Sequence, residues 1–168
     1  SFLKELKPVA IVETVRNDTI DRISQLISKT NQFKLNPTIL SSAEVRAWAE
    51  NILAIRFQDR LQDYGIVAVA VLEPDEGNDT LLIRNWVMSC RVFSRRLEYL
   101  TLELIAARAQ SANLSTLRLN FQLTKRNGFL HALLLELGFQ NNTEAGWFQT
   151  DTSSRKSMPA HFIDCDLY

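Results

Sequence analysis

Hydrophobic and polar positions recur along this chain in two patterns, one with a period of two residues and one with a helical period. Segments of the first kind are expected to be strands, and segments of the second kind amphipathic helices. The resulting order is strand, helix, helix, three strands, helix, strand, helix, strand. The predicted strands are Pro8–Val15, Leu53–Arg60, Tyr64–Pro74, Thr80–Cys90, Ser115–Leu123 and Gly146–Thr152, and the predicted helices are Asn17–Phe33, Ser41–Ile52, Arg95–Ala112 and Asn127–Leu137.

Residues suited to helix starts and turns lie at the ends of several of these segments. Asn17 or Asp18 can serve as the N-cap of the first helix, since either side chain can accept a backbone hydrogen bond there. Ser41 and Glu44 have the spacing of a capping box, which predicts the start of the second helix. A turn is expected at Asp75–Asp79, and the residues after the last strand are expected to form an irregular tail.

Length and composition are typical of one globular domain with a substantial core. The chain has 168 residues, of which 46% are hydrophobic and 23% charged. Its formal net charge is zero, which excludes a bulk electrostatic attraction to nucleic acid or to an anionic membrane surface. No apolar run approaches the ~20 residues that span a bilayer, and the opening residues lack the apolar core of a signal peptide.

The two cysteines, Cys90 and Cys165, lie far apart, and their spacing predicts neither a disulfide framework nor a metal site. A cytoplasmic protein with reduced thiols is expected. Cys90 ends a predicted strand, and Arg91, Arg95 and Arg96 lie between it and a long predicted helix. Such a junction is a common place for a bound phosphate or a nucleophile. The alternative is that Cys90 only fills space at the strand end.

The order of elements, with a basic loop between the fourth strand and a long helix, resembles that of GNAT acyltransferases. The resemblance implies an α/β (α+β) fold with a mixed, largely antiparallel central sheet flanked by helices, in one domain over residues 1–168. In that family the loop has the pattern Arg/Gln-x-x-Gly-x-Gly/Ala, and its amides hold the pyrophosphate of coenzyme A. Arg91 matches this pattern, whereas Ser94 and Arg96 occupy the two small positions. The added side chains make free coenzyme A a less favoured cofactor.

Several segments spread over nearly the whole chain carry a closer resemblance. They are ISKTNQFKLN (27–36), SAEVRA (42–47), IRFQDRLQDYGIVAVAVL (55–72), MSCRV (88–92), and LTKRN followed by LGF. Together they resemble the C-terminal, GNAT-like half of FkbH-like proteins. The resemblance implies transfer of a glyceryl unit from 1,3-bisphosphoglycerate to the phosphopantetheine of an acyl carrier protein in polyketide-type pathways. It also implies a partner phosphatase domain of the haloacid-dehalogenase type, whose Asp-rich motif this chain lacks, and residues 1–8 resemble the linker between the two halves.

The resemblance assigns roles to residues in three parts of the chain. Cys90 is expected to accept the acyl group as a thioester, because it follows the fourth strand, where GNAT folds hold the thioester. Substrate binding is expected from Thr30, Asn31, Gln32 and Asn127, and phosphopantetheine or phosphate binding from Arg91, Ser94, Arg95, Arg96 and Arg126. No metal site is expected. Structural alternatives stay open for Asn31, as a left-handed helix C-cap, and for Asn127, as a helix N-cap.

Two further residues bear on the reaction. GNAT N-acetyltransferases often have a tyrosine acid four residues before Gly-Phe, and Leu134 has that spacing here, so amine acetylation by that route is disfavoured. His131 is expected at the surface, without a catalytic role. Two alternatives to glyceryl transfer stay open. One is acyl transfer from another donor, and the other is a non-enzymatic docking module that binds an acidic carrier protein through the basic loop.

Overall fold

The computed structural model describes residues 1–141, 144–153 and 159–167. Its helices are α1 (Phe2–Glu5), α2 (Ile20–Lys29), α3 (Ser42–Ala47), α4 (Leu97–Ser111) and α5 (Phe129–Glu136), with 3₁₀ helices η1 (Ala49–Asn51), η2 (Glu76–Asn78) and η3 (Cys90–Val92). Its strands are β1 (Val9–Glu13), β2 (Phe33–Lys34), β3 (Ile52–Gln58), β4 (Asp63–Asp75), β5 (Thr80–Met88), β6 (Thr116–Asn120), β7 (Gln140–Asn141), β8 (Trp147–Asp151) and β9 (Asp164–Leu167). None of the helices among the described residues is long and apolar enough to cross a bilayer.

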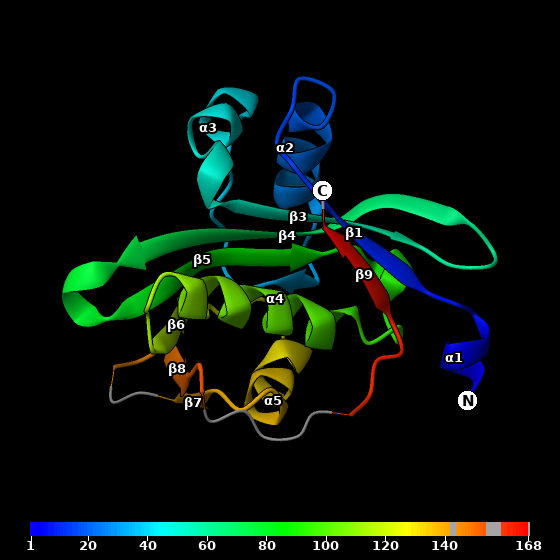
Figure 1. Cartoon of the computed structure of the whole chain (residues 1–168). Coiled ribbons are helices and arrows are strands. Elements are labelled where there is room, and N and C mark those ends of the chain that lie inside the picture. The colour runs from blue at the N-terminus through cyan, green and yellow to red at the C-terminus, as the bar shows by residue number, and fades with distance from the viewer. Residues whose placement is uncertain (142–143, 154–158, 168) are drawn as a thin grey trace.

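The strands form one nine-stranded sheet with helices on both faces (Figure 1). Eight of them follow the order β7-β8-β6-β5-β4-β3-β1-β9, and β2 pairs with β5 outside that path. The β1–β9 and β5–β6 pairs are parallel, and the other pairs of the described strands are antiparallel. This mixed, largely antiparallel sheet confirms the predicted fold class.

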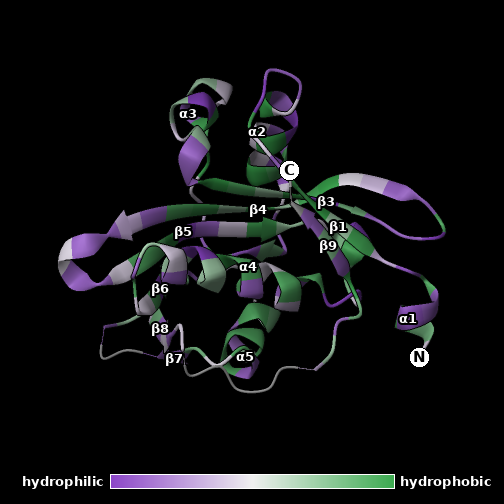
Figure 2. Cartoon of the chain, in the orientation of Figure 1, coloured by the Kyte–Doolittle hydropathy of each residue, from purple (hydrophilic) through white to green (hydrophobic). Residues whose placement is uncertain are grey.

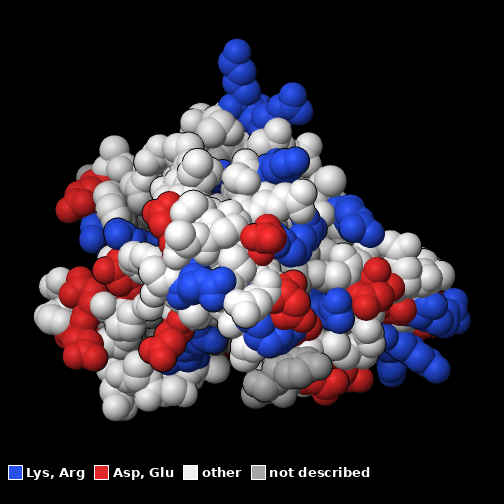
Figure 3. Space-filling view, turned by 90° about the horizontal axis from the view of Figure 1, so that it is seen from above, with Lys and Arg blue, Asp and Glu red and all other residues white. Residues whose placement is uncertain are grey.

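The helices α2 and α3 cover one face of the sheet, and α4 and α5 cover the other (Figure 1). The apolar side of α2, formed by Ile20, Ile23, Leu26 and Ile27, packs on buried valines of β4 and β5. A second cluster of buried residues lies between the sheet and the α4–α5 layer. Because β4 is covered on both faces, its residues 66–72 are continuously apolar (Figure 2). Over the α2–α3 face, basic and acidic side chains are interspersed (Figure 3), in keeping with the zero net charge.

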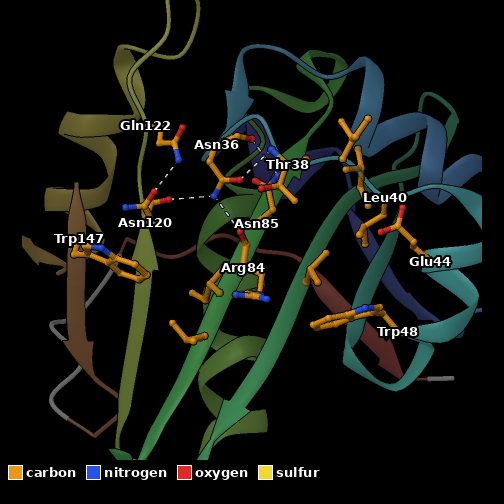
Figure 4. Close-up of a pocket in the computed structure, with 15 residues that line it drawn as sticks. Asn36, Thr38, Leu40, Glu44, Trp48, Arg84, Asn85, Asn120, Gln122 and Trp147 are labelled. Atoms are coloured by element: carbon orange, nitrogen blue, oxygen red, sulfur yellow. Dashed lines mark hydrogen bonds between the residues drawn. The ribbon is translucent and has the colours of Figure 1, made fainter. Parts of the chain in front are cut away.

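The parallel pair of β5 and β6 holds together only along its first residues. Thr80–Ile83 pair with Thr116–Leu119, whereas Val87 and Met88, farther along β5, pair with β2. The two strands therefore diverge. Residues Phe33–Thr38, here called the inserted segment, lie between their separated ends (Figure 4). The inserted segment is not expected from the sequence pattern, because its strand has only two residues.

The helix α2 begins at Ile20, later than the predicted start at Asn17. The expectation that Asn17 or Asp18 caps this helix is wrong, because Thr19 occupies the N-cap position. The Asp18 carboxylate instead accepts a hydrogen bond from Nε of Arg16 at 2.9 Å. Asp18 thus pairs with the Arg16 side chain, and Thr19 takes its place before the helix.

The predicted helix at Ser41–Ile52 is shorter than expected, although its start is confirmed. The Ser41 side chain accepts from the Glu44 amide at 3.2 Å, and the Glu44 carboxylate accepts from the Ser41 amide at 3.1 Å. This is the predicted capping box. The α-helix ends at Ala47, and η1 connects it to β3.

The expectation of an irregular tail is wrong for its last described residues. These form β9, which pairs in parallel with β1 at the edge of the sheet. Before β9, the Ala160 carbonyl accepts a hydrogen bond from Arg96 at 2.5 Å, and His161 lies 3.1 Å from the Glu103 carboxylate. Ile163 is buried. The strand has four residues, which is too short for its period to be recognised in the sequence.

The opening residues 1–8, which resemble a linker remnant, pack on the domain. They contain α1 and Leu6, whose side chain is 1% exposed. The Leu6 carbonyl accepts a hydrogen bond from the Arg60 amide in the β3–β4 turn at 2.7 Å. These residues thus add to the core, whatever precedes them in a longer chain.

Candidate active site

The loop after β5 places Cys90 at the surface. The strand ends at Met88, and the Ser89 side chain accepts a hydrogen bond from the Arg91 amide, which closes the 3₁₀ helix η3. Val92 is buried and anchors this turn, while Cys90 is exposed. The predicted strand therefore stops two residues before Cys90. An exposed cysteine in a turn does not fill space at a strand end, so the packing interpretation of this residue is wrong.

Cys90 lies in a hollow of about 340 Å³, here called the Cys90 hollow. Its walls come from one side of α2, the residues that follow α2, the end of β5 and the start of η3. The lining residues are Arg22, Gln25, Leu26, Lys29, Thr30, Asn31, Gln32, Met88, Ser89, Cys90 and Arg91. The structure thus brings together Cys90, Arg91 and the three polar residues predicted to bind substrate, although about sixty positions of sequence separate the two groups.

Three cationic side chains line the Cys90 hollow. Arg22 donates from Nε to the Ile66 carbonyl at 3.2 Å and from Nη1 to the Gln25 side chain at 3.2 Å. The Arg91 guanidinium lies over the Tyr64 ring, 5.5 Å from its centroid. Lys29 completes the set. Burial, together with the charge of nearby Arg91, lowers the pKa of Arg22 below its ordinary value.

No Asp or Glu is among the described residues that line the Cys90 hollow. Within the described part of the chain, no ion pair joins Arg22, Lys29 or Arg91 to a carboxylate. The hollow therefore carries a local excess of positive charge on a face where both signs are otherwise mixed (Figure 3). Such an excess attracts an anion.

Arg95 and Arg96 direct their guanidinium groups elsewhere. Arg95 donates to the Tyr64 hydroxyl at 3.2 Å, and its Nε lies 3.5 Å from the buried Asp59 carboxylate. Arg96 donates to the Ala160 carbonyl in the tail. Of the arginines in this loop, Arg91 alone is among the described residues that line the Cys90 hollow.

The backbone of this loop keeps the shape that glycines would adopt. Ser94 has φ 67° and Arg96 has φ 64°, both in the left-handed region that non-glycine residues rarely occupy. These are the two positions at which the resembling family has small residues. The conformation is therefore retained without the glycines, at a cost of about 1 kcal/mol or more for each residue.

A second hollow of about 340 Å³ lies on the other face of the sheet, between the start of α4 and one side of α5. It is here called the glutamate hollow, and its lining residues are Phe33, Met88, Phe93, Ser94, Glu98, Phe129, Ala132, Leu133 and Glu136. The rings of Phe33, Phe93 and Phe129 contact one another, with centroids 5.8–6.5 Å apart. Burial raises the pKa of the Glu98 carboxyl, and the charge of Glu136 raises it further.

Buried asparagine side chains hold the inserted segment in place (Figure 4). Asn36 bridges the two diverging strands, since its Nδ2 donates to the Arg84 carbonyl of β5 at 3.0 Å and to the Asn120 carbonyl of β6 at 3.2 Å. Asn85 of β5 donates to the carbonyls of Asn36 and Thr38 at 3.1 and 3.0 Å. These amide groups supply hydrogen bonds to backbone carbonyls where the two strands no longer pair with each other.

The Asn127 side chain also holds the inserted segment in place. Its side chain is 1% exposed and donates to the carbonyls of Lys34 and Gln122, both at 2.9 Å. Its Oδ1 accepts from the Thr124 amide at 2.7 Å. Gly128, not Asn127, occupies the N-cap position of α5, so the N-cap interpretation is wrong.

A cavity of about 520 Å³ lies beside the inserted segment on the α2–α3 side (Figure 4). Trp48 and Trp147 form opposite walls. Asn120 and Gln122 lie on the Trp147 side, and Arg84 lies between the two tryptophans. No described residue lines both this cavity and the Cys90 hollow. The two are separate sites.

The other residues considered from the sequence lie apart from Cys90. Arg126 is exposed in the loop before α5, and Leu134 is buried in that helix. His131 is exposed, as expected, and packs beside the Phe148 ring at 5.6 Å. The left-handed C-cap proposed for Asn31 is wrong, because Thr30 ends α2 with extended backbone and Asn31 does not have positive φ.

The sequence did not indicate Arg22, Gln25 and Lys29 as members of the site. They are spaced three and four residues apart and therefore share one side of α2, next to its apolar side. That spacing is a usable signal, but it also fits an ordinary solvated helix face. Arg22, Gln25 and Lys29 are recognised as site residues only because α2 packs beside the end of β5.

The chain matches no protein-family model and no curated protein sequence. Its structure is similar to that of the ribosomal-protein-S18-alanine N-acetyltransferase from Escherichia coli, with a TM-score of 0.61, 14% identity, and coverage of 90% of this chain and 99% of that chain. It is also similar to the spermidine N-acetyltransferase from Vibrio cholerae in complex with CoA and spermine, with a TM-score of 0.62, 10% identity, and coverage of 88% of this chain and 96% of that chain. A third similar structure is YncA from Salmonella typhimurium with acetyl-CoA, with a TM-score of 0.58, 12% identity, and coverage of 90% of this chain and 99% of that chain. The chain thus has the fold of GNAT acetyltransferases.

Proposed function

We propose that this chain is an acyltransferase domain that carries an acyl group on the sulfur of Cys90. The observation that carries the proposal is the Cys90 hollow, where an exposed thiol shares one concave surface with three cations and with hydroxyl and amide groups. In its specific form, the proposal is transfer of a glyceryl unit derived from 1,3-bisphosphoglycerate to the phosphopantetheine thiol of an acyl carrier protein.

The chemistry consists of two acyl transfers. In the first, the Cys90 thiol loses its proton to solvent, and its sulfur attacks the carbonyl carbon of the acyl phosphate. The bond from that carbon to the bridging oxygen breaks, phosphate leaves with the electron pair, and a thioester forms. The remaining phosphate ester of the glyceryl unit is hydrolysed by the partner phosphatase. In the second transfer, the carrier thiolate attacks the thioester, and Cys90 leaves as a thiolate.

The lining residues fit these steps. Thr30, Asn31 and Gln32 offer hydroxyl and amide groups that can hydrogen-bond the two hydroxyls of a glyceryl unit. Arg22, Lys29 and Arg91 place positive charge beside the thiol, which attracts the anionic donor. The acyl carrier protein, the phosphatase partner, a cytoplasmic location and the phosphate-binding roles of Ser94, Arg95, Arg96 and Arg126 stay predictions.

A second candidate is acetyl transfer from acetyl-CoA. The left-handed backbone of Ser94 and Arg96 favours it, and two of the similar structures are complexes with acetyl-CoA and CoA. The remaining residues fit coenzyme A poorly. Glu98 and Glu136 line the hollow on the α4 side, where they would repel a pyrophosphate, and the inserted segment already fills the gap between β5 and β6. We therefore place this candidate second.

Intact-protein mass spectrometry after incubation with 1,3-bisphosphoglycerate and the partner phosphatase domain tests the proposal. The expected result is a glyceryl adduct on the wild type that is absent from Cys90→Ser. Cys165→Ser is the matched control. Cys165 is half-buried, and its pKa is raised by burial and by the nearby Asp166 and Glu103 carboxylates, so this control should keep the adduct.

Two results would contradict the proposal. The first is an adduct that survives Cys90→Ser, which would put the acyl group elsewhere. The second is a folded wild type that acquires no adduct from a competent donor. In the second case, the basic loop would be better explained as a docking surface for an acidic carrier protein.

A further inference from the structure

The two hollows that meet at the end of β5 carry opposite charge. The Cys90 hollow, on the α2 side, has three cationic side chains and no carboxylate among its described lining residues. The glutamate hollow, on the α4 side, has two carboxylates and no Lys or Arg among its described lining residues. Met88 lines both, so the two hollows are neighbours on opposite faces of the sheet.

We infer that phosphate-bearing reactants reach Cys90 from the α2 side of the sheet, where Arg22, Lys29 and Arg91 bind their phosphate, and not from the α4 side. This inference rests on the proposed function, since it names the chemistry that the same thiol accepts. It reassigns the phosphate contacts to two residues of α2 and one of η3, away from the loop that begins α4.

The Arg22 and Arg91 pair is the strongest argument for an anion on the α2 side. Both side chains line the same hollow, Arg22 from α2 and Arg91 from η3, and the charge of Arg91 adds to burial in lowering the pKa of Arg22. No carboxylate of the described residues is paired with either of them. Like charges held together without a counterion repel each other, and a bound phosphate would remove that repulsion.

The opposite side is unsuited to the same group. Glu98 belongs to the first turn of α4, so its carboxylate takes the place at the helix N-terminus where an anion would otherwise be favoured. Glu136 adds a second negative charge. Arg96, at the N-cap position of α4, donates to the Ala160 carbonyl in the tail. An arm entering between β5 and β6 would also have to displace the inserted segment and its asparagine hydrogen bonds.

Both half-reactions involve a reactant that bears a phosphate, and this phosphate has two sources. In the acyl donor the phosphate is bonded next to the reacting carbon. In the acceptor it lies at the far end of the flexible phosphopantetheine arm from the thiol. The first experiment tests the acceptor phosphate and does not require acyl transfer. In a Cys165→Ser background, mass spectrometry follows disulfide exchange of Cys90 with pantethine, which is neutral, and with the disulfide of 4′-phosphopantetheine.

At low ionic strength, the phosphorylated disulfide is expected to react faster than the neutral one. A unit charge removed about 7 Å away in a water-like dielectric changes the rate about threefold, so each of Arg22→Gln, Lys29→Gln and Arg91→Gln should lower the ratio of the two rates by about that factor. Lys29 and Arg91 are exposed, so the test does not depend on the half-buried Arg22 variant folding well.

Two variants serve as controls. Arg46→Gln removes an exposed cation of α3 that hydrogen-bonds Asn17 and lies outside both hollows, and it should leave the ratio unchanged. Glu98→Gln should also leave it unchanged. An increase of the ratio in Glu98→Gln would mean that the phosphate approaches from the α4 side, and it would overturn the inference.

A second experiment tests the donor phosphate. It measures the rate at which acetyl phosphate acetylates Cys90 in the same variants. A slower rate in the Arg22, Lys29 and Arg91 variants would show that the donor phosphate binds in the Cys90 hollow. A lower exchange ratio in the first experiment would show the same for the acceptor phosphate. The inference is overturned if neither reaction depends on the three cations. If exchange depends on them while no donor ever acylates Cys90, the inference stands and the proposed function fails.

Discussion

Replacing Asn127 with alanine should destabilise the fold strongly, because this side chain joins the inserted segment to the loop before α5. Its amide group donates to the carbonyls of Lys34 and Gln122, and its carbonyl oxygen accepts from the Thr124 amide. The side chain is 1% exposed, so water cannot easily replace these partners. The substitution therefore leaves backbone polar groups without partners inside the fold.

The magnitude follows from the three lost hydrogen bonds. Each contributes about 1 kcal/mol net, and a buried group left unsatisfied costs more, so a loss of about 3–4 kcal/mol in the free energy of unfolding is expected. With a urea dependence of about 2 kcal/mol per molar, the unfolding midpoint should fall by about 1.5–2 M at unchanged slope. Urea titration monitored by far-ultraviolet circular dichroism measures both quantities.

Asn120→Ala is the matched control, because Asn120 is also an asparagine beside the inserted segment. Among the described residues, its side-chain oxygen accepts one exposed hydrogen bond, from Gln122 at 3.2 Å, so its loss should cost less than about 1 kcal/mol. Asn127→Asp should be at least as damaging as Asn127→Ala, since a carboxylate would face two carbonyl oxygens. If Asn127→Ala lowered only activity and left the urea midpoint near that of Asn120→Ala, the structural argument would be refuted and the substrate-binding role supported.

The remaining predictions concern the loop and helix on the α4 side. Because burial raises the folded-state pKa of Glu98 above its ordinary value of 4.5, wild-type stability should decline as pH rises through that pKa. Glu98→Gln, which cannot ionise, should then melt higher than wild type near neutral pH and lose this advantage in acid. A difference that is constant with pH would contradict the argument. Ser94→Gly relieves a left-handed φ of 67° and should raise the melting temperature by about 1–3 °C, whereas Ser94→Val should lower it. Free coenzyme A at millimolar concentration should not raise the melting temperature of the wild type, and a clear increase would favour the second candidate function.

Periodicity and capping chemistry predict the long elements of this fold well. The apolar side of α2, the capping box of Ser41 and Glu44, and the extent of α4 all follow from local sequence. The short elements could not be predicted, because β2 and β9 are formed by pairing with distant strands and not by local preference. Asp18 shows the same limit, since its side chain is taken by Arg16 and not by the helix that it precedes.

The candidate site could be predicted in its parts but not in its assembly. Cys90 and the polar residues at the end of α2 come from family resemblance, and the structure brings them together in one hollow. The cations Arg22 and Lys29 could not be foreseen, because their position depends on how α2 lies across the sheet. Asn127 shows the opposite case, since its buried place explains why an asparagine is needed there without assigning it to the substrate.

The inserted segment also has a consequence for how the chain folds. Its hydrogen bonds join residues far apart in sequence: 48 positions for Asn36 to Arg84, 84 for Asn36 to Asn120, and 93 for Asn127 to Lys34. Closing such long loops costs conformational entropy that neighbouring hairpins such as β3–β4 and β4–β5 do not face. The β3–β4–β5 meander should therefore form first and the gap beside it should close last. The amides at the closure should then exchange with solvent through openings smaller than global unfolding, which makes this junction a separate, late-forming unit of the domain.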